Sequence, residues 1–224
     1  MQVTYLVPCY FVPPPQREQI VWNDRFKGDR GADCLISVDC VDFRIPNHGP
    51  AFSSHKFNKK SGLRYEIALC IQTGDCVWVN GPYACGRNPD ITIFRDSLIH
   101  FLSDGERCEA DDGYIGEAPQ RIKCPKSFTN KQETEFMQQR VRNRQESINN
   151  RLKFWSILQN AGGRGFRHHL SSHGSVVRAI LVLVQLSINQ GEPLFETGYK
   201  DPPFEPPDAN NPPRNTGYQR NYDL

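Results

Sequence analysis

The 224-residue sequence predicts one mixed α/β domain. Strand-like runs fill the first half of the chain, and helical periodicity dominates the second half. The composition, 38% hydrophobic and 23% charged, is typical of a globular protein. We expect the domain to cover residues 20–198, after an irregular, proline-rich leader at residues 1–19. Residues 199–224 are expected to form a disordered Pro-rich tail, because six prolines fall within the 24 residues from Asp201 onward.

Four strands are predicted from apolar and β-branched runs that turn-forming residues interrupt. They cover residues 34–45, 63–72, 76–80 and 106–110. The second and third form a hairpin around Gly74, and Gly81-Pro82 is expected to end the third strand. The fourth runs into the turn Asp111-Asp112-Gly113-Tyr114. These strands predict a mixed sheet.

Helices are predicted at residues 17–26, 90–103, 129–158 and 176–189, flanking the sheet. Asp90 is expected to cap the second helix. The third helix sorts its residues by face. Its apolar stripe holds Val141, Ile148, Leu152 and Trp155, and its polar face holds Arg142, Glu146, Asn149, Asn150 and Lys153.

The charge of the chain is unevenly distributed. The formal net charge is +2, but residues 121–167 contain eleven Lys or Arg against three Glu, a local net charge of +8. The rest of the chain therefore has a net charge of −6. Such asymmetry favours a basic face for a polyanion, with a solvated helix face as the alternative.

The eight cysteines show no CxxC pair, and several lie in apolar runs, so we expect reduced, buried thiols of an intracellular protein. A secreted disulfide framework is the alternative. Residues 1–10 lack a basic start, and prolines interrupt the apolar stretch that follows, so no signal peptide is expected. The apolar run at residues 179–184 ends at Gln185, which predicts a soluble protein with no membrane contact.

Three carboxylates stand out by position. Asp39 interrupts an apolar strand, where a charge is costly unless it is paired or bound to a metal. Asp111 lies where the fourth strand enters a turn, and Glu146 lies on the polar face of the long helix. Carboxylate oxygens are the ligands that Mg²⁺ prefers. From spacing alone, each residue also has a structural explanation, as a turn cap for Asp39, an Asx turn for Asp111, and an ion pair with Arg142 or Lys153 for Glu146.

Several motifs occur together in a fixed order. They are Ser37-Val38-Asp39-Cys40-Val41-Asp42-Phe43, Gly81-Pro82-Tyr83, Ala110-Asp111-Asp112-Gly113-Tyr114, Arg144-Gln145-Glu146-Ser147-Ile148-Asn149 with Lys153, and Phe166-Arg167-His168. In this order and spacing, over about residues 20–196, the chain resembles the DDE superfamily endonucleases, specifically the PIF/Harbinger-type transposases.

The resemblance implies a ribonuclease H-like fold in which Asp39, Asp111 and Glu146 are the catalytic residues and bind Mg²⁺ or Mn²⁺. It implies a metal-dependent DNA endonuclease or transposase core that cleaves, and in transposition joins, DNA phosphodiester bonds by a two-metal mechanism. A nuclear location, a separate DNA-binding helper protein and homo-oligomers would accompany such an activity. Only about thirty residues precede the first strand, so we expect a catalytic core without the family's upstream DNA-binding region.

The first motif departs from the family pattern, because Asp39-Cys40-Val41 stands where relatives often have Asp-Gly-Thr. Asp42 and Asp112 are rival ligands for the positions given to Asp39 and Asp111. The alternative function is a catalytically inactive, transposon-derived DNA- or protein-binding module.

Basic residues close to these acids are candidates for DNA phosphate contacts. They are Lys56, Lys59 and Lys60 in the loop after the first strand, and Arg142 and Lys153 on the long helix. Plain solvated surface is the alternative for the loop lysines. His168, His169 and His173 lack the partners of a zinc site, so a helix-start or packing role is expected.

Overall fold

The computed structural model describes residues 21–27, 34–127, 132–158, 166 and 169–194, without the side chains of residues 132–138 and 140. The predicted leader at residues 1–19 and the predicted tail at residues 199–224 lie outside the described residues. Cys9 and His168 lie outside them as well.

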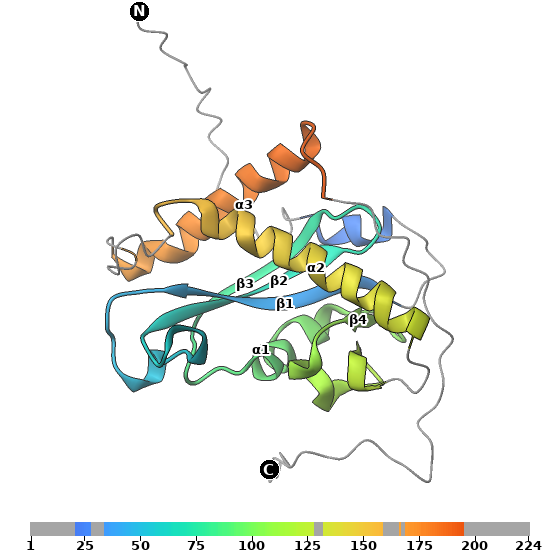
Figure 1. Cartoon of the computed structure of the whole chain (residues 1–224), viewed down its shortest axis with the longest axis horizontal. Coiled ribbons are helices and arrows are strands. Elements are labelled where there is room, and N and C mark those ends of the chain that lie inside the picture. The colour runs from blue at the N-terminus through green and yellow to red at the C-terminus, as the bar shows by residue number, and fades with distance from the viewer. Residues whose placement is uncertain (1–20, 28–33, 128–131, 159–165, 167–168, 195–224) are drawn as a thin grey trace, which may run out of the picture.

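Five strands form one mixed sheet in the order β3-β2-β1-β4-β5 (Figure 1). The strands are β1 (Cys34–Arg44), β2 (Gly62–Cys70), β3 (Cys76–Ala84), β4 (Arg107–Glu109) and β5 (Ile122–Lys123). β1 runs antiparallel to β2, and β2 runs antiparallel to β3. On the other side, β4 runs parallel to β1, and β5 runs parallel to β4. β1 is therefore the central strand, and the strand direction changes across it.

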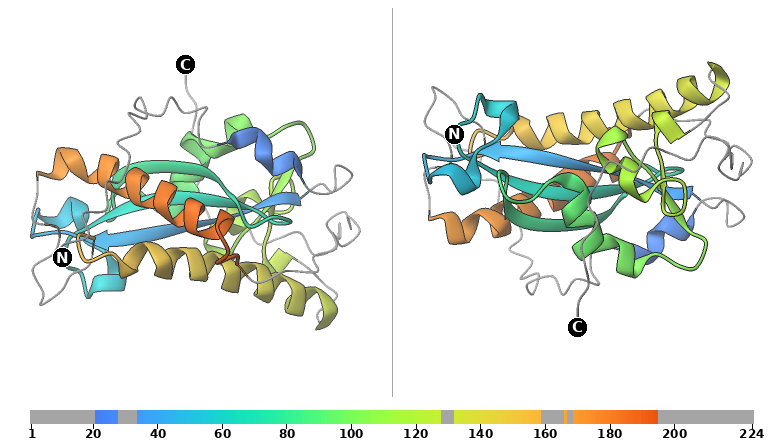
Figure 2. Two further views of the ribbon diagram at one scale, coloured as in Figure 1. Left: turned by 90° about the horizontal axis from the view of Figure 1, so that it is seen from above. Right: turned by 90° about the horizontal axis from the view of Figure 1, so that it is seen from below.

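Helices cover both faces of this sheet (Figure 1; Figure 2). α2 (Gln132–Phe154) and α3 (His173–Asn189) lie on one face, and α1 (Asp90–Asp96) lies on the other. Side chains of β1 alternate between two cores: Val41 and Phe43 pack with residues of α2 and α3, whereas Ile36 and Val38 pack with residues of α1. A strand that is buried on both faces reads as a continuous apolar run, as the sequence of β1 does.

The predicted fold class is confirmed as α/β, with a mixed sheet flanked by helices. Four strands lie close to their expected positions, but β5 was missed because two residues carry no periodic pattern. The expectation that Gly81-Pro82 ends the third strand was wrong, since β3 continues to Ala84. Pro82 is tolerated there because β3 is an edge strand, and the pairing of β2 with β3 shifts register between Arg64 and Glu66.

α1 is shorter than predicted. It ends at Asp96, and the chain continues as the 3₁₀ helix η5 (Leu98–Phe101), because Ser97 leaves helical geometry with φ −141° and ψ −88°. Asp90 is the first helical residue, not the cap, because Pro89 precedes it at the N-cap position. The apolar positions Phe94 and Leu98 are nevertheless buried, as the periodicity predicts.

The two faces of α2 differ from the prediction at two residues. Val141, Ile148 and Leu152 are buried as expected. Trp155 is 38% exposed because α2 ends at Phe154 and the stripe is not continued. Asn149, predicted on the polar face, is only 6% exposed. The side-chain amide of Asn149 therefore lies against the sheet.

α3 packs its apolar face into the core beside α2, through residues such as Val177, Ile180 and Val184. Within the described part of the chain, Leu170–Asn189 is the one helical stretch long and apolar enough to cross a membrane, by length and composition only. Only 39% of that stretch is buried. One side of α3 faces the core, whereas Val182, Leu183 and Leu186 on the other side are exposed.

The expectation of buried thiols is confirmed for the cysteines within the described residues. They are free and buried: Cys34, Cys40, Cys70, Cys76, Cys85, Cys108 and Cys124.

Candidate functional site

Asp39 lies in the middle of β1 and projects toward α2, on the same face as Val41. Its carboxylate accepts hydrogen bonds from the backbone N–H of Cys40 (2.7 Å) and from Nδ2 of Asn149 (2.8 Å). Burial, helped by the nearby carboxylates of Asp111 and Asp90, raises the pKa of Asp39 to about 6. Lys56 and the Cys40 N–H act in the opposite direction. Asp39 is therefore a desolvated carboxylate among charged neighbours.

Asp111 lies two residues beyond the end of β4. Because Ser37 of β1 pairs with Glu109 of β4 in parallel register, Asp39 and Asp111 each stand two residues further along adjacent parallel segments. The charge of Asp111 raises the pKa of Asp39, which agrees with this placement. Asp111 is exposed, and its Oδ1 caps the short 3₁₀ helix η6 (Asp112–Glu117) by accepting from the N–H of Gly113 at 2.8 Å. The predicted Asx turn is therefore present, and the structure also brings Asp111 beside Asp39.

Two amide side chains on α2 attach the helix to the sheet. Gln145 accepts a hydrogen bond from the Ser37 hydroxyl (3.0 Å) and donates one to the carbonyl oxygen of Ile67 (3.0 Å). One turn further along, Asn149 donates to Asp39. Sequence reasoning assigned Asn149 to the polar face. The sequence signal for its position was spacing: Asn149 is four residues after Gln145 and directly follows Ile148, so it lies on the same side of the helix as Gln145, next to the apolar stripe.

Glu146 lies on α2 between these two amides and is exposed. Burial lowers the pKa of Lys153, and the charge of Glu146 partly opposes this, so the two residues lie within electrostatic reach. No described hydrogen bond joins Glu146 to Asp39 or Asp111. Among the described residues, no three Asp, Glu, His or Cys side chains are grouped closely enough to hold a metal by themselves. The structure thus brings two of the three predicted acids together and leaves Glu146 to one side.

The rival ligand Asp42 is engaged elsewhere. It accepts two hydrogen bonds from Arg64, at 2.7 and 3.0 Å, and one from the Ser54 hydroxyl at 2.7 Å. Burial alone would raise the pKa of Asp42, but these bonds outweigh it and lower the pKa. Asp112, the rival of Asp111, accepts from the backbone N–H of Lys126 and forms an ion pair with its Nζ at 3.3 Å. Both rivals are therefore held by structural partners.

Asp90 is a further carboxylate that the sequence indicated only as a helix cap. It forms an ion pair with Arg64, and burial raises its pKa. Asp90 and Asp111 each raise the pKa of Asp39. Three acids from β1, the turn after β4 and the start of α1 therefore share one electrostatic environment.

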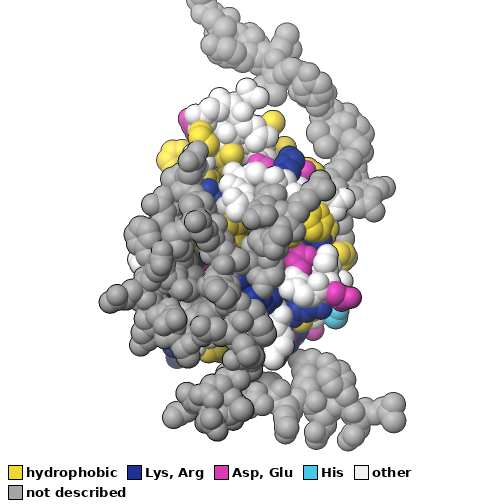
Figure 3. Space-filling view, turned by 90° about the vertical axis from the view of Figure 1, so that its right-hand side faces the viewer, with side chains coloured by type: hydrophobic (Ala, Val, Ile, Leu, Met, Phe, Trp, Pro, Cys, Tyr) yellow, Lys and Arg dark blue, Asp and Glu magenta, His cyan; other side chains and the backbone are white. Residues whose placement is uncertain are grey.

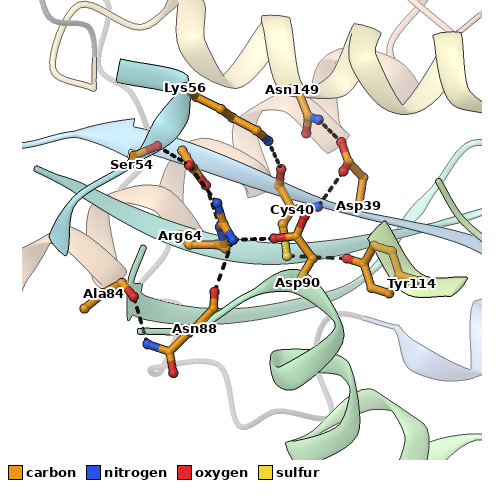
Figure 4. Close-up of polar contacts among 11 residues, drawn as sticks. Asp39, Cys40, Ser54, Lys56, Arg64, Ala84, Asn88, Asp90, Tyr114 and Asn149 are labelled. Atoms are coloured by element: carbon orange, nitrogen blue, oxygen red, sulfur yellow. Dashed lines mark hydrogen bonds and ion pairs between the residues drawn. The ribbon is translucent and has the colours of Figure 1, made fainter. Parts of the chain in front are cut away.

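Two of the five predicted DNA-binding residues lie close to Asp39. Lys56, from the 3₁₀ helix η4 (His55–Phe57), donates to the carbonyl oxygen of Cys40 at 3.0 Å, and its charge lowers the pKa of Asp39. Lys153 of α2 has a lowered pKa, first because of burial and then because Lys56 repels it. In Figure 4, Lys56 and Asn149 reach the same segment of β1, Asp39-Cys40, from η4 and α2.

The other three predicted DNA contacts are Lys59, Lys60 and Arg142. Lys59 and Lys60 are exposed at the loop tip, where Asn58 and Lys59 have positive φ. Arg142 is half-buried about two turns before Asn149. Among the described side chains visible in Figure 3, basic and acidic side chains lie next to one another.

The histidine expectation is confirmed in part. His173 is fully buried and its Nδ1 is hydrogen-bonded to the Tyr65 hydroxyl at 2.7 Å, which is a packing role. His169 is exposed, just before the short 3₁₀ helix Leu170–Ser172.

No protein-family model and no curated protein sequence matches the chain.

Proposed function

We propose that the protein is a metal-dependent DNA endonuclease or transposase core with a ribonuclease H-like fold. The observation that carries the proposal is the placement of Asp39 and Asp111 at the same level of two adjacent parallel segments, in the centre of the sheet. This placement brings two acids that are far apart in the sequence to neighbouring positions in the fold.

The sheet supports the fold assignment. The sheet has three consecutive antiparallel strands, followed by two short strands parallel to the first. A long helix lies across the central strand. The DDE resemblance implies this arrangement. The first acid lies in the central strand, and the second acid follows the next strand in the sheet.

The donor set fits a hard divalent cation. Asp39 and Asp111 offer carboxylate oxygens, which Mg²⁺ and Mn²⁺ prefer, and the described cysteines offer no exposed soft ligand. When bound, such a cation neutralises charge on a phosphodiester and activates the attacking oxygen. Asp39 and Asp111 would hold the cation, and Lys56 and Lys153 would bind the phosphate beside it. Glu146, one turn from Asn149, is retained as the family's third acid.

A plasmid-nicking assay with Mg²⁺ or Mn²⁺ tests the proposal. Asp39→Asn and Asp111→Asn are expected to lower the nicking rate by at least about a hundredfold with the fold retained. Asp104→Asn, at an exposed carboxylate outside the site, is the matched control and should nick at the wild-type rate. Wild-type nicking that survives both site substitutions would refute the assignment.

The second candidate is a catalytically inactive, transposon-derived DNA- or protein-binding module. It is favoured by the position of Glu146, because the described residues do not gather three acids around one point. This module would bind DNA with a strong salt dependence and show no turnover with either metal. A nuclear location, a helper protein and homo-oligomers belong to both candidates only through the family resemblance.

A further inference from the structure

The side-chain oxygen of Asn149 is a buried acceptor without a hydrogen bond. Asn149 is 6% exposed, its Nδ2 donates to Asp39, and its Oδ1 has no hydrogen-bond partner among the described residues. A buried carbonyl oxygen that loses its water and gains no partner destabilises the folded state. Such atoms are rare in folded proteins, and an ion or water commonly accounts for them. The unsatisfied oxygen belongs to the same amide whose Nδ2 contacts Asp39, the carboxylate that the proposed function assigns to a cation.

We propose that the Asn149 side-chain oxygen is a third protein ligand of the cation held by Asp39 and Asp111. This inference rests on the metal site of the proposed function. An amide oxygen is a hard, neutral donor of the kind that Mg²⁺ and Mn²⁺ accept. Oδ1 and Nδ2 are both bonded to Cγ. A rotation about the Cβ–Cγ bond therefore exchanges them and turns Oδ1 toward Asp39, where Nδ2 now donates.

The position of Asn149 is fixed by its surroundings. Gln145, one turn earlier, is hydrogen-bonded to both β1 and β2, through Ser37 and Ile67. Ile148 is fully buried in the core beneath α2. The backbone of α2 is therefore anchored at two positions just before Asn149, and only the last side-chain torsion of Asn149 has to change on binding.

A neutral oxygen also suits the charge of this site. Asp39 and Asp111 give two negative charges, and a neutral oxygen completes a protein contribution that leaves room for water and phosphate. Glu146 is exposed on the next turn, whereas Asn149 already touches Asp39. Asn149 thus offers a ligand one turn of α2 after Glu146, which the proposed function keeps as the third acid.

The rival explanation is that Asn149 only positions Asp39 through its N–H. Replacement by a soft ligand separates the two roles. If residue 149 binds the cation directly, Asn149→Cys places a thiolate on the metal. The affinity for Cd²⁺ should then rise by roughly tenfold, with a new thiolate-to-cadmium ultraviolet absorption. Mn²⁺ affinity, followed by electron paramagnetic resonance of the free ion, should fall by about tenfold or more. Asn150→Cys, on the exposed neighbour, is the matched control and should leave the affinities for both metals unchanged.

A loss of Mn²⁺ affinity in Asn149→Cys without any gain for Cd²⁺ would overturn the inference and leave a positioning role. A second measurement needs no substitution. In wild-type protein with asparagine labelled by ¹³C at the side-chain carbonyl, bound Mn²⁺ should show a ¹³C hyperfine coupling, and its absence would also overturn the inference. Mn²⁺ binding that depends on Asn149 in a protein that cuts no DNA would support the ligand and reject the nuclease.

Discussion

Asp42 and Arg64 face each other directly across β1 and β2 and form a two-pronged ion pair, with N–O distances of 2.7 and 3.0 Å. The side chain of Asp42 is 1% exposed and that of Arg64 is 12% exposed. Arg64 also donates to the carbonyl oxygen of Asn88 and pairs with Asp90 (Figure 4). One guanidinium therefore connects the central strand to the start of α1, close to Asp39.

Removing this guanidinium should destabilise the fold. Arg64→Met leaves the carboxylate of Asp42 buried without its charged partner, so we expect the free energy of unfolding to fall by about 3–5 kcal/mol. Denaturant unfolding measures this. The double variant Arg64→Met/Asp42→Leu removes both charges and should recover much of the loss, because the cost comes from an unpaired buried charge. If the single variant is as stable as wild type, the pair does not hold these strands together.

Lys56 and Lys153 should contribute to DNA binding through phosphate charge. Lys56→Ala is expected to weaken binding at all sequences alike and to reduce the slope of log K against log salt by about 0.9. Lys153→Ala should act similarly, and the two together should change the slope by about twice as much. Titrations of a duplex oligonucleotide at several salt concentrations give these slopes.

The control for the lysine variants is Lys27→Ala. Lys27 is exposed and its Nζ pairs with Asp24 at 2.6 Å on η2 (Trp22–Lys27), so its loss should leave the salt dependence unchanged. Equal slopes for wild type and Lys56→Ala would exclude Lys56 from the contact.

The strand acids were predictable because strand patterns are local. An acid inside an apolar run and an acid at a strand end are visible in the sequence, and parallel pairing of β1 with β4 is what brings Asp39 and Asp111 level. The pairing itself was not predictable from spacing, because register depends on contacts between distant segments. Likewise, β5 became a strand only because β4 was beside it.

The contribution of α2 was harder to predict. Helical periodicity gives a repeating pattern of faces but not the angle at which the helix meets the sheet. The packing of α2 on the sheet buries Asn149, which was expected on the polar face, and leaves Glu146 exposed on that face as expected. The end of α2 at Phe154, likewise, removed Trp155 from a stripe that the pattern continued.

The buried carboxyl of Glu66 should make stability fall as the pH rises. Glu66 is fully buried, accepts from Nε1 of Trp78 at 3.0 Å and from the Ser97 hydroxyl at 3.2 Å, and burial raises its pKa to about 8. Its pKa in the unfolded chain is near 4.5, the ordinary value for this group. Between these values the unfolded state loses the proton and the folded state keeps it. The stabilisation is therefore complete below pH 4.5 and is lost as the pH rises to 8.

Glu66→Gln removes this titration and keeps an acceptor for Trp78 and Ser97. We expect wild-type stability to fall with a slope approaching about 1.4 kcal/mol per pH unit within the window, and the variant to lack this contribution. Unfolding free energies at pH 5, 6, 7 and 8 give the two slopes. Parallel profiles for variant and wild type would mean that Glu66 is already ionised in the folded protein.

His173 should act with the opposite sign on the acid side. Burial among Tyr65, Phe43 and Phe166 lowers its pKa to about 4, from an ordinary value of 6.5. The unfolded chain binds a proton as the pH falls below 6.5, whereas the folded protein resists protonation until about pH 4. Stability that is present above pH 6.5 is therefore lost as the pH falls through this window.

His173→Phe tests this in a site already lined by aromatic rings. The Tyr65 hydroxyl loses its partner, so stability at pH 7 should fall by about 1–3 kcal/mol, but the decline between pH 6.5 and pH 4 should become shallower. In Tyr65→Phe/His173→Phe the unpaired hydroxyl is also removed, so part of the pH 7 loss should return while the shallow acid profile remains. An acid profile as steep as that of the wild type in both variants would assign the acid loss to carboxylates elsewhere, because neither variant carries an imidazole at this position.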